Sequence, residues 1–335
     1  MRLTRRGYGL LAVVVAAELM AFGFGARTLN AVAAPGAIAL VGAAVQVRRS
    51  DRPSVDRSPV SAGFPGDSRR ITVEVSGEGV AHIEEEIPDG IGAEGATVEA
   101  RLPDTFEYTL VFDRRGEYTL GPMTVRVRDV LGLVEETYTP AGKRRVLVYP
   151  SVYQLAGEQV LVQRALDISE VERQEFDSLR EYVPGDPLRD VHWKSSAKDP
   201  ETMYVTEFAD RQADHDVVVA ATADDGHADE MAAAAASLAV AGLDAGLGVE
   251  LHLPSTSVPM GRDEEHRRTL LAALARTGAG ALPEVTWEGA DVRIHAHDGG
   301  VDVEFGAERH TLDAMTVSRE NPLATAHGQE GGADA

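Results

Sequence analysis

Residues 216–253 read DVVVAATADDGHADEMAAAAASLAVAGLDAGLGVELHL, and they indicate the architecture of the C-terminal part of the chain. Asp216–Ala221 is continuously apolar after its first residue, which is typical of a buried parallel strand. Ala228–Ala245 has the length and composition of a helix, and Gly248–Leu253 follows as a second strand. This strand–helix–strand order predicts an α/β domain with a doubly wound sheet.

The residues after this stretch extend the same pattern. Asp263–Arg276 is amphipathic with a helical period, and Asp291–Ala296 and Val301–Phe305 read as the strands of a hairpin. We therefore expect the α/β domain to cover residues 151–307. Residues 308–335 lose this periodicity and end in Ala, Gly and acidic residues, which predicts a disordered tail.

Residues 53–150, which precede this domain, are divided into short runs by Gly and Pro. Several short strands at this spacing predict a β-sandwich of the immunoglobulin-like type. The sequence clusters no candidate catalytic groups here, so we expect a spacer or a protein-binding module. The runs that alternate with period two are Ile71–Val75, Thr97–Leu102, Thr105–Phe112, Gly116–Leu120, Met123–Arg128 and Arg145–Tyr149.

Residues 1–52 contain two apolar runs, 8–24 and 29–47. A helix of about 20 residues, with a lower limit of ~17, crosses a bilayer, so the two runs predict a transmembrane helical hairpin. Arginines are more frequent outside the hairpin than in its turn, where only Arg27 occurs. The positive-inside rule then predicts a two-span cell-membrane protein with cytoplasmic soluble domains. The arginines of the outer flanks are Arg2, Arg5, Arg6, Arg48, Arg49, Arg52 and Arg57.

A secretory signal peptide is the alternative interpretation of this region. Ala31-Val32-Ala33 fits a cleavage site with small residues. Cleavage there leaves the apolar stretch 34–47 at the new amino terminus, which is a poor start for a secreted protein, so the hairpin is favoured. Glu18 is the single charge within the first run. It is either a functional intramembrane carboxylate or, as we favour, a protonated or helix-paired residue of a short tilted span.

The composition excludes several classes of function. The chain has 32 Lys+Arg against 54 Asp+Glu, a net charge of −22, which disfavours binding to nucleic acid. Cysteine is absent, which excludes disulfides, thiol nucleophiles and zinc–thiolate sites. The acidity also predicts a protein of a halophile, because a Debye length of ~3 Å at 1 M salt screens such a surface from itself.

Residues 174–210, near the start of the expected α/β domain, contain the most distinctive motif. Gly185-Asp186-Pro187 is a helix-start signal, since Asp caps the free N–H groups and Pro at the first helical position has none. On the helix that follows, Arg189 and Trp193 are one turn apart. We favour a structural role for these residues as cap, ion pair and core anchor. Direct contact with a partner or a ligand is the alternative.

This motif resembles that of a known family, the proteins called domain of unknown function 58. A second piece with the family's pattern is Arg115–Pro122 followed by Asp129–Leu133. The resemblance covers nearly the whole chain and implies a membrane hairpin, a β-rich region and a von Willebrand A-like α/β domain. The acidity adds a halophilic archaeon as the expected source. The residues that match the main motif are Tyr182, Gly185, Asp186, Arg189, Trp193, Ser196 and Ala197.

The resemblance also implies a partner, because genes of this family often lie beside those of MoxR-type AAA+ ATPases. The chain departs from the fuller members at the metal site of a von Willebrand A domain. That site needs Asp-x-Ser-x-Ser after the first strand, but the chain has Ala221–Asp225, without serine. We therefore expect no metal and no other cofactor. Asp224 or Asp225 holding a cation is the alternative to solvated loop acids.

The other chemical motifs are incomplete. Ser195-Ser-Ala-Lys198 matches Ser-x-x-Lys, but the Ser-Asp-Asn and Lys-Thr-Gly motifs that accompany it in penicillin-recognising enzymes do not occur. His295 and His297 lie on one side of a predicted strand, an arrangement that can coordinate a metal ion through two imidazoles, although the spacing of other residues suggests no third ligand.

The sequence thus predicts a membrane-anchored adaptor or scaffold that is not an enzyme and works with a MoxR-type ATPase in protein assembly or maturation. A hydrolase that uses the Asp186–Lys198 helix and an exported cell-surface adhesion protein are the alternatives.

Overall fold

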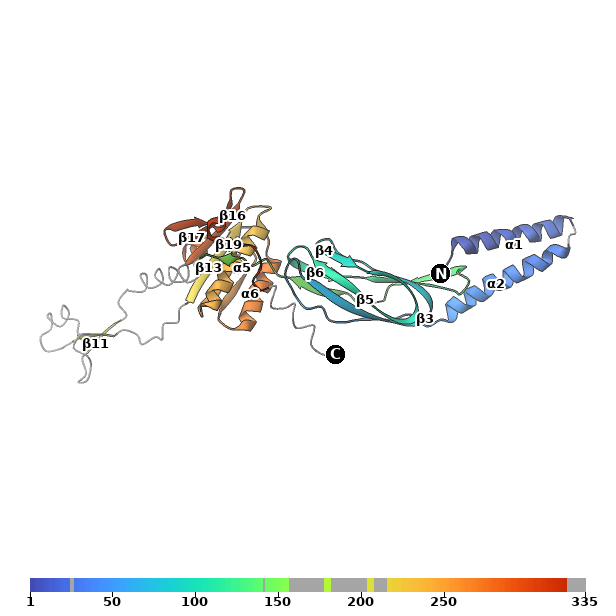
Figure 1. Cartoon of the computed structure of the whole chain (residues 1–335), viewed down its shortest axis with the longest axis horizontal. Helices are drawn as coiled ribbons and strands as arrows, with labels where there is room; N and C mark the ends of the chain where they lie inside the picture. The colour runs from blue at the N-terminus through green and yellow to red at the C-terminus, as the bar shows by residue number, and fades with distance from the viewer. Residues whose placement is uncertain (25–26, 141, 157–177, 182–203, 208–215, 324–335) are drawn as a thin grey trace. The chain divides into compact units, whose positions relative to one another are not determined.

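A computed structural model describes residues 1–24, 27–140, 142–156, 178–181, 204–207 and 216–323. The chain divides into two compact units, Met1–Tyr149 and Pro150–Ala335, which are described separately here. The first contains the apolar helices and a β-rich domain, and the second contains a mixed α/β sheet (Figure 1).

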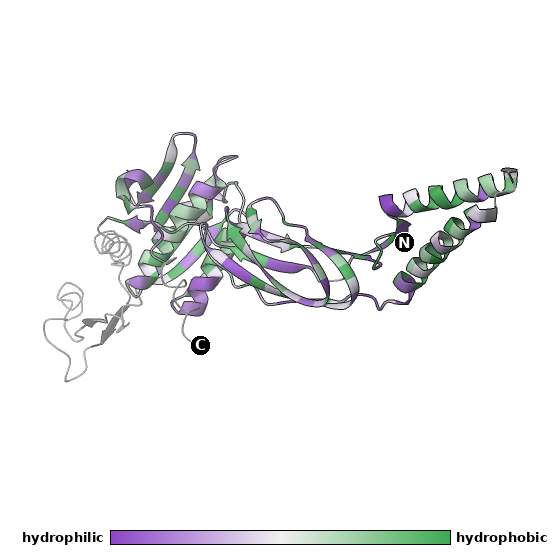
Figure 2. Cartoon of the chain, turned by 45° about the vertical axis from the view of Figure 1, so that its right-hand side comes forward, coloured by the Kyte–Doolittle hydropathy of each residue, from purple (hydrophilic) through white to green (hydrophobic). Residues whose placement is uncertain are grey.

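The predicted apolar helices are present as α1 (Arg5–Phe24) and α2 (Asn30–Arg49), joined through the short 3-10 helix Arg27–Leu29. They pack through small side chains, with Val14, Ala17 and Ala33 buried between them. Gly36 allows the close approach, because a Cβ there would lie 2.6 Å from a methyl carbon of Val14. The other faces of both helices are apolar and largely exposed (Figure 2).

The β-rich domain is antiparallel, as predicted, and its main sheet has seven strands in the order β1-β8-β7-β3-β5-β4, with β2 also on β3. A second sheet pairs β6 with β9. The strands are β1 (Arg2–Leu3), β2 (Val55–Arg57), β3 (Ser68–Glu85), β4 (Ile91–Glu94), β5 (Thr97–Phe112), β6 (Gly116–Leu120), β7 (Met123–Arg128), β8 (Val134–Tyr138) and β9 (Arg144–Val148).

Two of the expected strands, Thr97–Leu102 and Thr105–Phe112, form the single long strand β5. Pairing with β3 continues through a register shift between Val75 and Gly79, and both halves of β3 contribute to one core. Ile71 and Val73 come from the first half, and Ile83 from the second. The same core contains Leu120 of β6 and Val148 of β9, so the second sheet packs on it and the domain is a sandwich.

The second unit is built on a six-stranded sheet in the order β15-β14-β13-β16-β17-β18. Strand β13 is parallel to both β14 and β16, and the outer pairs are antiparallel. Helix α5 follows β13, so the predicted strand–helix–strand order is present. The elements are β13 (Asp216–Ala223), α5 (Ala228–Asp244), β14 (Gly248–Leu253), β15 (Thr256–Gly261), α6 (Glu264–Arg276), α7 (Glu284–Glu288), β16 (Val292–His297), β17 (Gly300–Phe305) and β18 (Glu308–Thr311).

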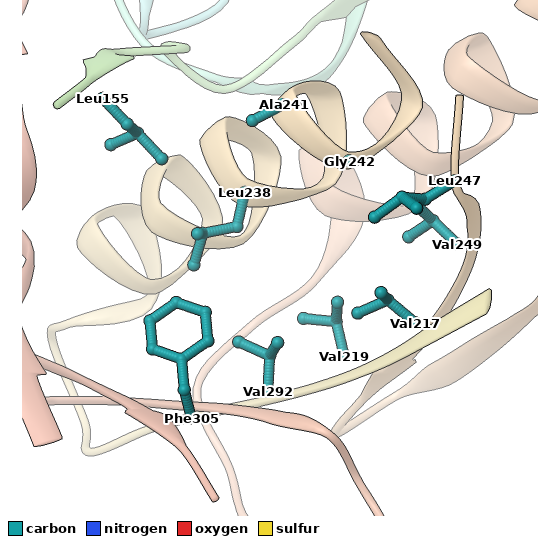
Figure 3. A pocket seen from close by; sticks show the side chains of 10 residues that line it. All are labelled: Leu155, Val217, Val219, Leu238, Ala241, Gly242, Leu247, Val249, Val292 and Phe305. Carbon is teal, nitrogen blue, oxygen red and sulfur yellow. The ribbon is translucent and has the colours of Figure 1, made fainter. Parts of the chain in front are cut away.

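Helix α5 covers one face of this sheet. Its Leu238 lies above Val219, Val292 and Phe305, which point up from the strands toward the helix (Figure 3). A residual cavity of about 30 Å³ between them is lined by apolar groups. A doubly wound domain needs helices on both faces. In the described residues α5 packs on the sheet and α6 packs against α5. This contact does not place a helix on the opposite face, so the doubly wound arrangement stays a prediction.

The sequence predicts a disordered tail from residue 308, but the structure has ordered elements beyond that residue. Residues 308–318 form β18, the helical turn α8 (Leu312–Met315) and β19 (Thr316–Ser318). Leu312 and Met315 are buried, and β19 pairs with β10 (Gln154–Leu155). The sequence did not predict this packing, because two apolar residues within a polar stretch are too few to form a periodic pattern. A further pair, β11 (Ser178–Glu181) with β12 (Tyr204–Glu207), completes the described strands.

Candidate functional site

The residues of the main motif lie outside the described residues, because positions 182–203 are not among them. The serine–lysine pair Ser195 and Lys198 lies in the same stretch. Two other places contain the polar groups that the sequence singled out. One is the carboxyl edge of the parallel strands, and the other is the loop that carries the Asp129–Leu133 motif.

The carboxyl ends of parallel strands meet at one edge of a sheet, where ligands commonly bind in α/β proteins. Strand β13 ends at Ala223 and leads through Asp224 to His227 at the start of α5. Strand β16 lies beside it and ends at His297, which Asp298 follows. The Asp224 N–H donates to the Ala296 carbonyl at 2.9 Å, which holds the two strand ends together.

Each histidine at this edge has a carboxylate partner. His227 Nε2 lies 3.0 Å from Asp298 Oδ1, and His295 Nε2 lies 3.8 Å from Asp224 Oδ1. The other nitrogen of His295, Nδ1, is 3.0 Å from the Thr222 hydroxyl. Asp224 and Asp298 are exposed, so solvent screens both pairs.

His295 and His297 lie on one side of β16, as predicted, with ring centroids 5.4 Å apart and planes at 25°. The Gly299 N–H donates to His297 Nδ1 at 3.0 Å, so the neutral ring carries its proton on Nε2. That nitrogen lies 3.5 Å from Asp302 Oδ2. The two imidazole rings thus stack on each other, but His295 pairs with Asp224 and His297 with Asp302.

The described residues contain no group of three or more His, Asp or Glu side chains arranged to hold a metal ion. Asp225 is exposed in the turn before α5. The edge is therefore a polar rim of separate histidine–carboxylate pairs.

The loop between β7 and β8 is built by Asp129, whose carboxylate accepts three backbone N–H groups. These come from Leu131 at 2.8 Å and from Leu133 and Val134 at 2.7 Å each. Gly132 has a φ of +66°, a left-handed conformation that favours glycine. The motif Asp129–Leu133 is thus a tightly held turn.

The same loop fastens the start of α1. The Thr4 N–H donates to the Leu133 carbonyl at 2.9 Å, and the Thr4 hydroxyl donates to the Gly132 carbonyl at 2.5 Å. A Cβ at Gly7 would overlap the Leu133 carbonyl oxygen, so the helix approaches closely. Strand β1 pairs with β8 just before the helix begins. Sequence reasoning missed this attachment.

Arg2 reinforces the attachment through Glu135 on β8. The Arg2 Nε–H donates to Glu135 Oε1 at 2.7 Å, and the Arg128 Nε–H donates to Oε2 at 3.1 Å. Burial raises the pKa of Glu135, but the hydrogen bonds and charges of the two arginines outweigh it, so its pKa lies below the ordinary value.

The sequence analysis counts Arg57 among the arginines that flank the membrane spans. The structure corrects this, because Arg57 is buried in the sandwich. Its side chain is 3% exposed, and its guanidinium forms an ion pair with Glu85, whose side chain is 0% exposed. Burial raises the pKa of Glu85 despite the attraction of Arg57. The Tyr108 hydroxyl donates to Glu85 at 3.4 Å, and burial together with the Glu85 charge raises the pKa of Tyr108.

The second family-like piece, Arg115–Pro122, also has a structural role. It forms β6 between two glycines with positive φ, Gly116 and Gly121. A Cβ at Gly121 would lie 3.0 Å from a carboxylate oxygen of Glu85, so the turn approaches the buried ion pair closely.

No family model matches the chain, and no curated protein matches it. Solved structures share short parts of it at low similarity. WR4, a C. elegans MSP family member, has a TM-score of 0.22 and 7% identity, covering 28% of this chain and 94% of its own. The PKD domain of an M14-like peptidase from a Thermoplasmatales archaeon has a TM-score of 0.23 and 16% identity over 30% and 97%. A chaperone–tip adhesin complex of CFA/I fimbriae has a TM-score of 0.21 and 15% identity over 31% and 60%.

Proposed function

We propose that the chain is a membrane-anchored adaptor, not an enzyme, whose soluble domains lie in the cytoplasm and engage a MoxR-type AAA+ ATPase. The observation that carries the anchor is the exposure of the apolar helices. The apolar windows of α1 and α2 are only 11% and 22% buried, unlike a core helix of a soluble protein. Exposed apolar surface on this scale fits contact with lipid.

The attachment of the amino terminus supports retention of the hairpin over removal as a signal peptide. Cleavage after Ala33 would remove β1, the Thr4 contacts with the β7–β8 loop, and the Arg2–Glu135 ion pair. A leader that is removed has no need of such contacts with the mature domain. We therefore propose two spans, with both outer ends on the same side.

The cytoplasmic side is proposed from flanking arginines that stay exposed, among them Arg5 and Arg6 in the first turn of α1 and Arg48 and Arg49 at the end of α2. The turn contains only Arg27. This difference favours cytoplasmic ends under the positive-inside rule, even without the buried Arg57.

Cysteine labelling tests the anchor and the orientation, because every introduced thiol is the only one in the chain. Thr28→Cys lies in the turn, and Ser255→Cys in the exposed β14–β15 turn. A membrane-impermeant maleimide should label Thr28→Cys on intact cells and Ser255→Cys only after lysis. Labelling of Ser255→Cys on intact cells would support the exported adhesion protein, and a shortened chain would support the signal peptide.

The ATPase partnership is tested by affinity purification of the full chain from detergent extracts, with and without an ATP analogue. We expect an AAA+ subunit to be recovered. Repeated failure would remove the ATPase from the proposal and leave the anchor standing. An Arg189→Ala variant with unchanged thermal stability that loses the ATPase would assign the main motif to recognition. A serine-directed probe that labels Ser195 or Ser196 would favour the hydrolase.

A further inference from the structure

The β7–β8 loop presents apolar side chains to solvent although its backbone is tightly held. Val130 is 79% exposed and Leu131 is 56% exposed. The Asp129 carboxylate fixes this turn through three backbone N–H groups, so the two side chains are displayed on a rigid loop. Two neighbouring apolar side chains held in solvent on a rigid loop are suited to contact with an apolar occupant.

The position of the loop identifies that occupant. Gly132 and Leu133 accept hydrogen bonds from Thr4, one residue before α1 begins at Arg5. On α2, Ala43 and Val47 pack against Leu133. The loop thus lies at the ends of both helices, where a spanning hairpin meets the membrane surface.

An open groove of about 1000 Å³ lies between the loop and the first turn of α1. Arg5, Arg6 and Tyr8 line it and are exposed. In the described part of the chain, no ion pair joins either arginine to an acidic side chain. Tyrosine is enriched at the level of lipid headgroups, and arginine binds phosphate strongly.

Three acids line the groove, and each has a partner. Glu99 is exposed and lies 3.9 Å from Arg128 and 3.7 Å from His82. Asp129 accepts the N–H groups of its own loop, and Glu135 is paired with Arg2 and Arg128. Among the described residues, the lining charges without an ion pair are Arg5 and Arg6, and their positive charge matches anionic phospholipid. Basic residues beside a membrane bind anionic headgroups.

We propose that this loop is a second membrane contact. Val130 and Leu131 insert into the interfacial layer of an anionic phospholipid bilayer, and Arg5 and Arg6 bind headgroup phosphates in the adjoining groove. The contact fixes the sandwich against the membrane surface instead of leaving it on a free tether. This inference rests on the membrane anchor of the proposed function and is independent of which side the sandwich occupies.

The test uses the full chain reconstituted in vesicles, with an environment-sensitive fluorophore on Val130→Cys. The control is Asp89→Cys, an exposed position that follows β3 by four residues. The last residue of β3, Glu85, pairs with Met123 at the start of β7, whereas the β7–β8 loop follows Arg128 at the other end of that strand. Vesicles contain phosphatidylcholine with or without phosphatidylglycerol. Lipid carrying a headgroup nitroxide should quench the label at position 130 several-fold more strongly than at position 89, and most strongly with phosphatidylglycerol.

Two variants on the Val130→Cys background separate the parts of the contact. Leu131→Glu should expel the loop and reduce quenching to the level of position 89. Arg6→Gln should reduce the response to phosphatidylglycerol, whereas Arg114→Gln, an exposed arginine elsewhere on the sandwich, should not. Equal quenching in both vesicle types would overturn headgroup recognition.

Resistance to alkaline carbonate extraction distinguishes failure of this inference from failure of the anchor. Equal quenching at positions 130 and 89 in a carbonate-resistant chain overturns loop insertion alone. A chain that carbonate extracts overturns the anchor, and loop insertion with it.

Discussion

Arg57 holds the buried carboxylate of Glu85 with two hydrogen bonds, Nε–H to Oε2 at 2.8 Å and Nη2–H to Oε1 at 2.9 Å. Its Nη1–H also donates to the Gly142 carbonyl. This arrangement links β2, β3 and the loop before β9 at one point in the sandwich. The side chains of both ions are almost fully excluded from solvent.

Arg57→Met should destabilise the sandwich by about 3–5 kcal/mol, because it leaves the Glu85 charge buried without its partner. Glu85→Met should have a similar cost for the same reason. The double variant should be less destabilised than the sum, since removing both ions removes the unpaired charge. Denaturant unfolding of the four proteins checks this, and additive single effects would contradict a buried pair.

Glu135 should make stability depend on pH in the acidic range. Its pKa is below the ordinary value, so its contribution is present above about pH 4.5 and is lost as pH falls through the lowered pKa. Glu135→Gln should therefore cost about 1 kcal/mol at pH 7 and almost nothing at low pH. Unfolding curves of both proteins from pH 7 downward test the sign. A difference that grows on acidification would contradict it.

Gly7→Ala should loosen α1 from the β7–β8 loop, because the added Cβ would meet the Leu133 carbonyl oxygen. Gly9→Ala is the matched control, since nothing lies within 4 Å of a Cβ there. It should slightly stabilise the helix, by up to about 1 kcal/mol. Hydrogen exchange at the Thr4 amide, which donates to Leu133, should accelerate only in Gly7→Ala.

Ser237→Ala should destabilise the α/β unit by about 1–3 kcal/mol. The buried Ser237 hydroxyl accepts the Tyr153 N–H at 2.8 Å and donates to the Ala233 carbonyl at 2.6 Å. Alanine leaves the Tyr153 N–H without this acceptor. Ser255→Ala in the exposed turn should be neutral in the same thermal unfolding assay. Equal melting temperatures for the two variants would show that the Ser237 bonds add no stability.

The sequence by itself determined the elements that depend on composition and local period. The two apolar helices follow from runs long enough to cross a bilayer, and the order of β13, α5, β14 and α6 follows from runs of matching length and period. The stacked pair His295 and His297 also followed from period two, because alternate residues of a strand share a face.

Only the tertiary structure decided which residues far apart in the chain meet. Arg48 and Arg57 look alike as flanking arginines, yet Arg48 is exposed and Arg57 is buried against Glu85. Likewise, nothing local to Thr4 indicates its contact with Gly132, which lies 128 positions away. Such pairings depend on strand register and on packing between elements, whereas hydrophobic period is a property of each segment alone.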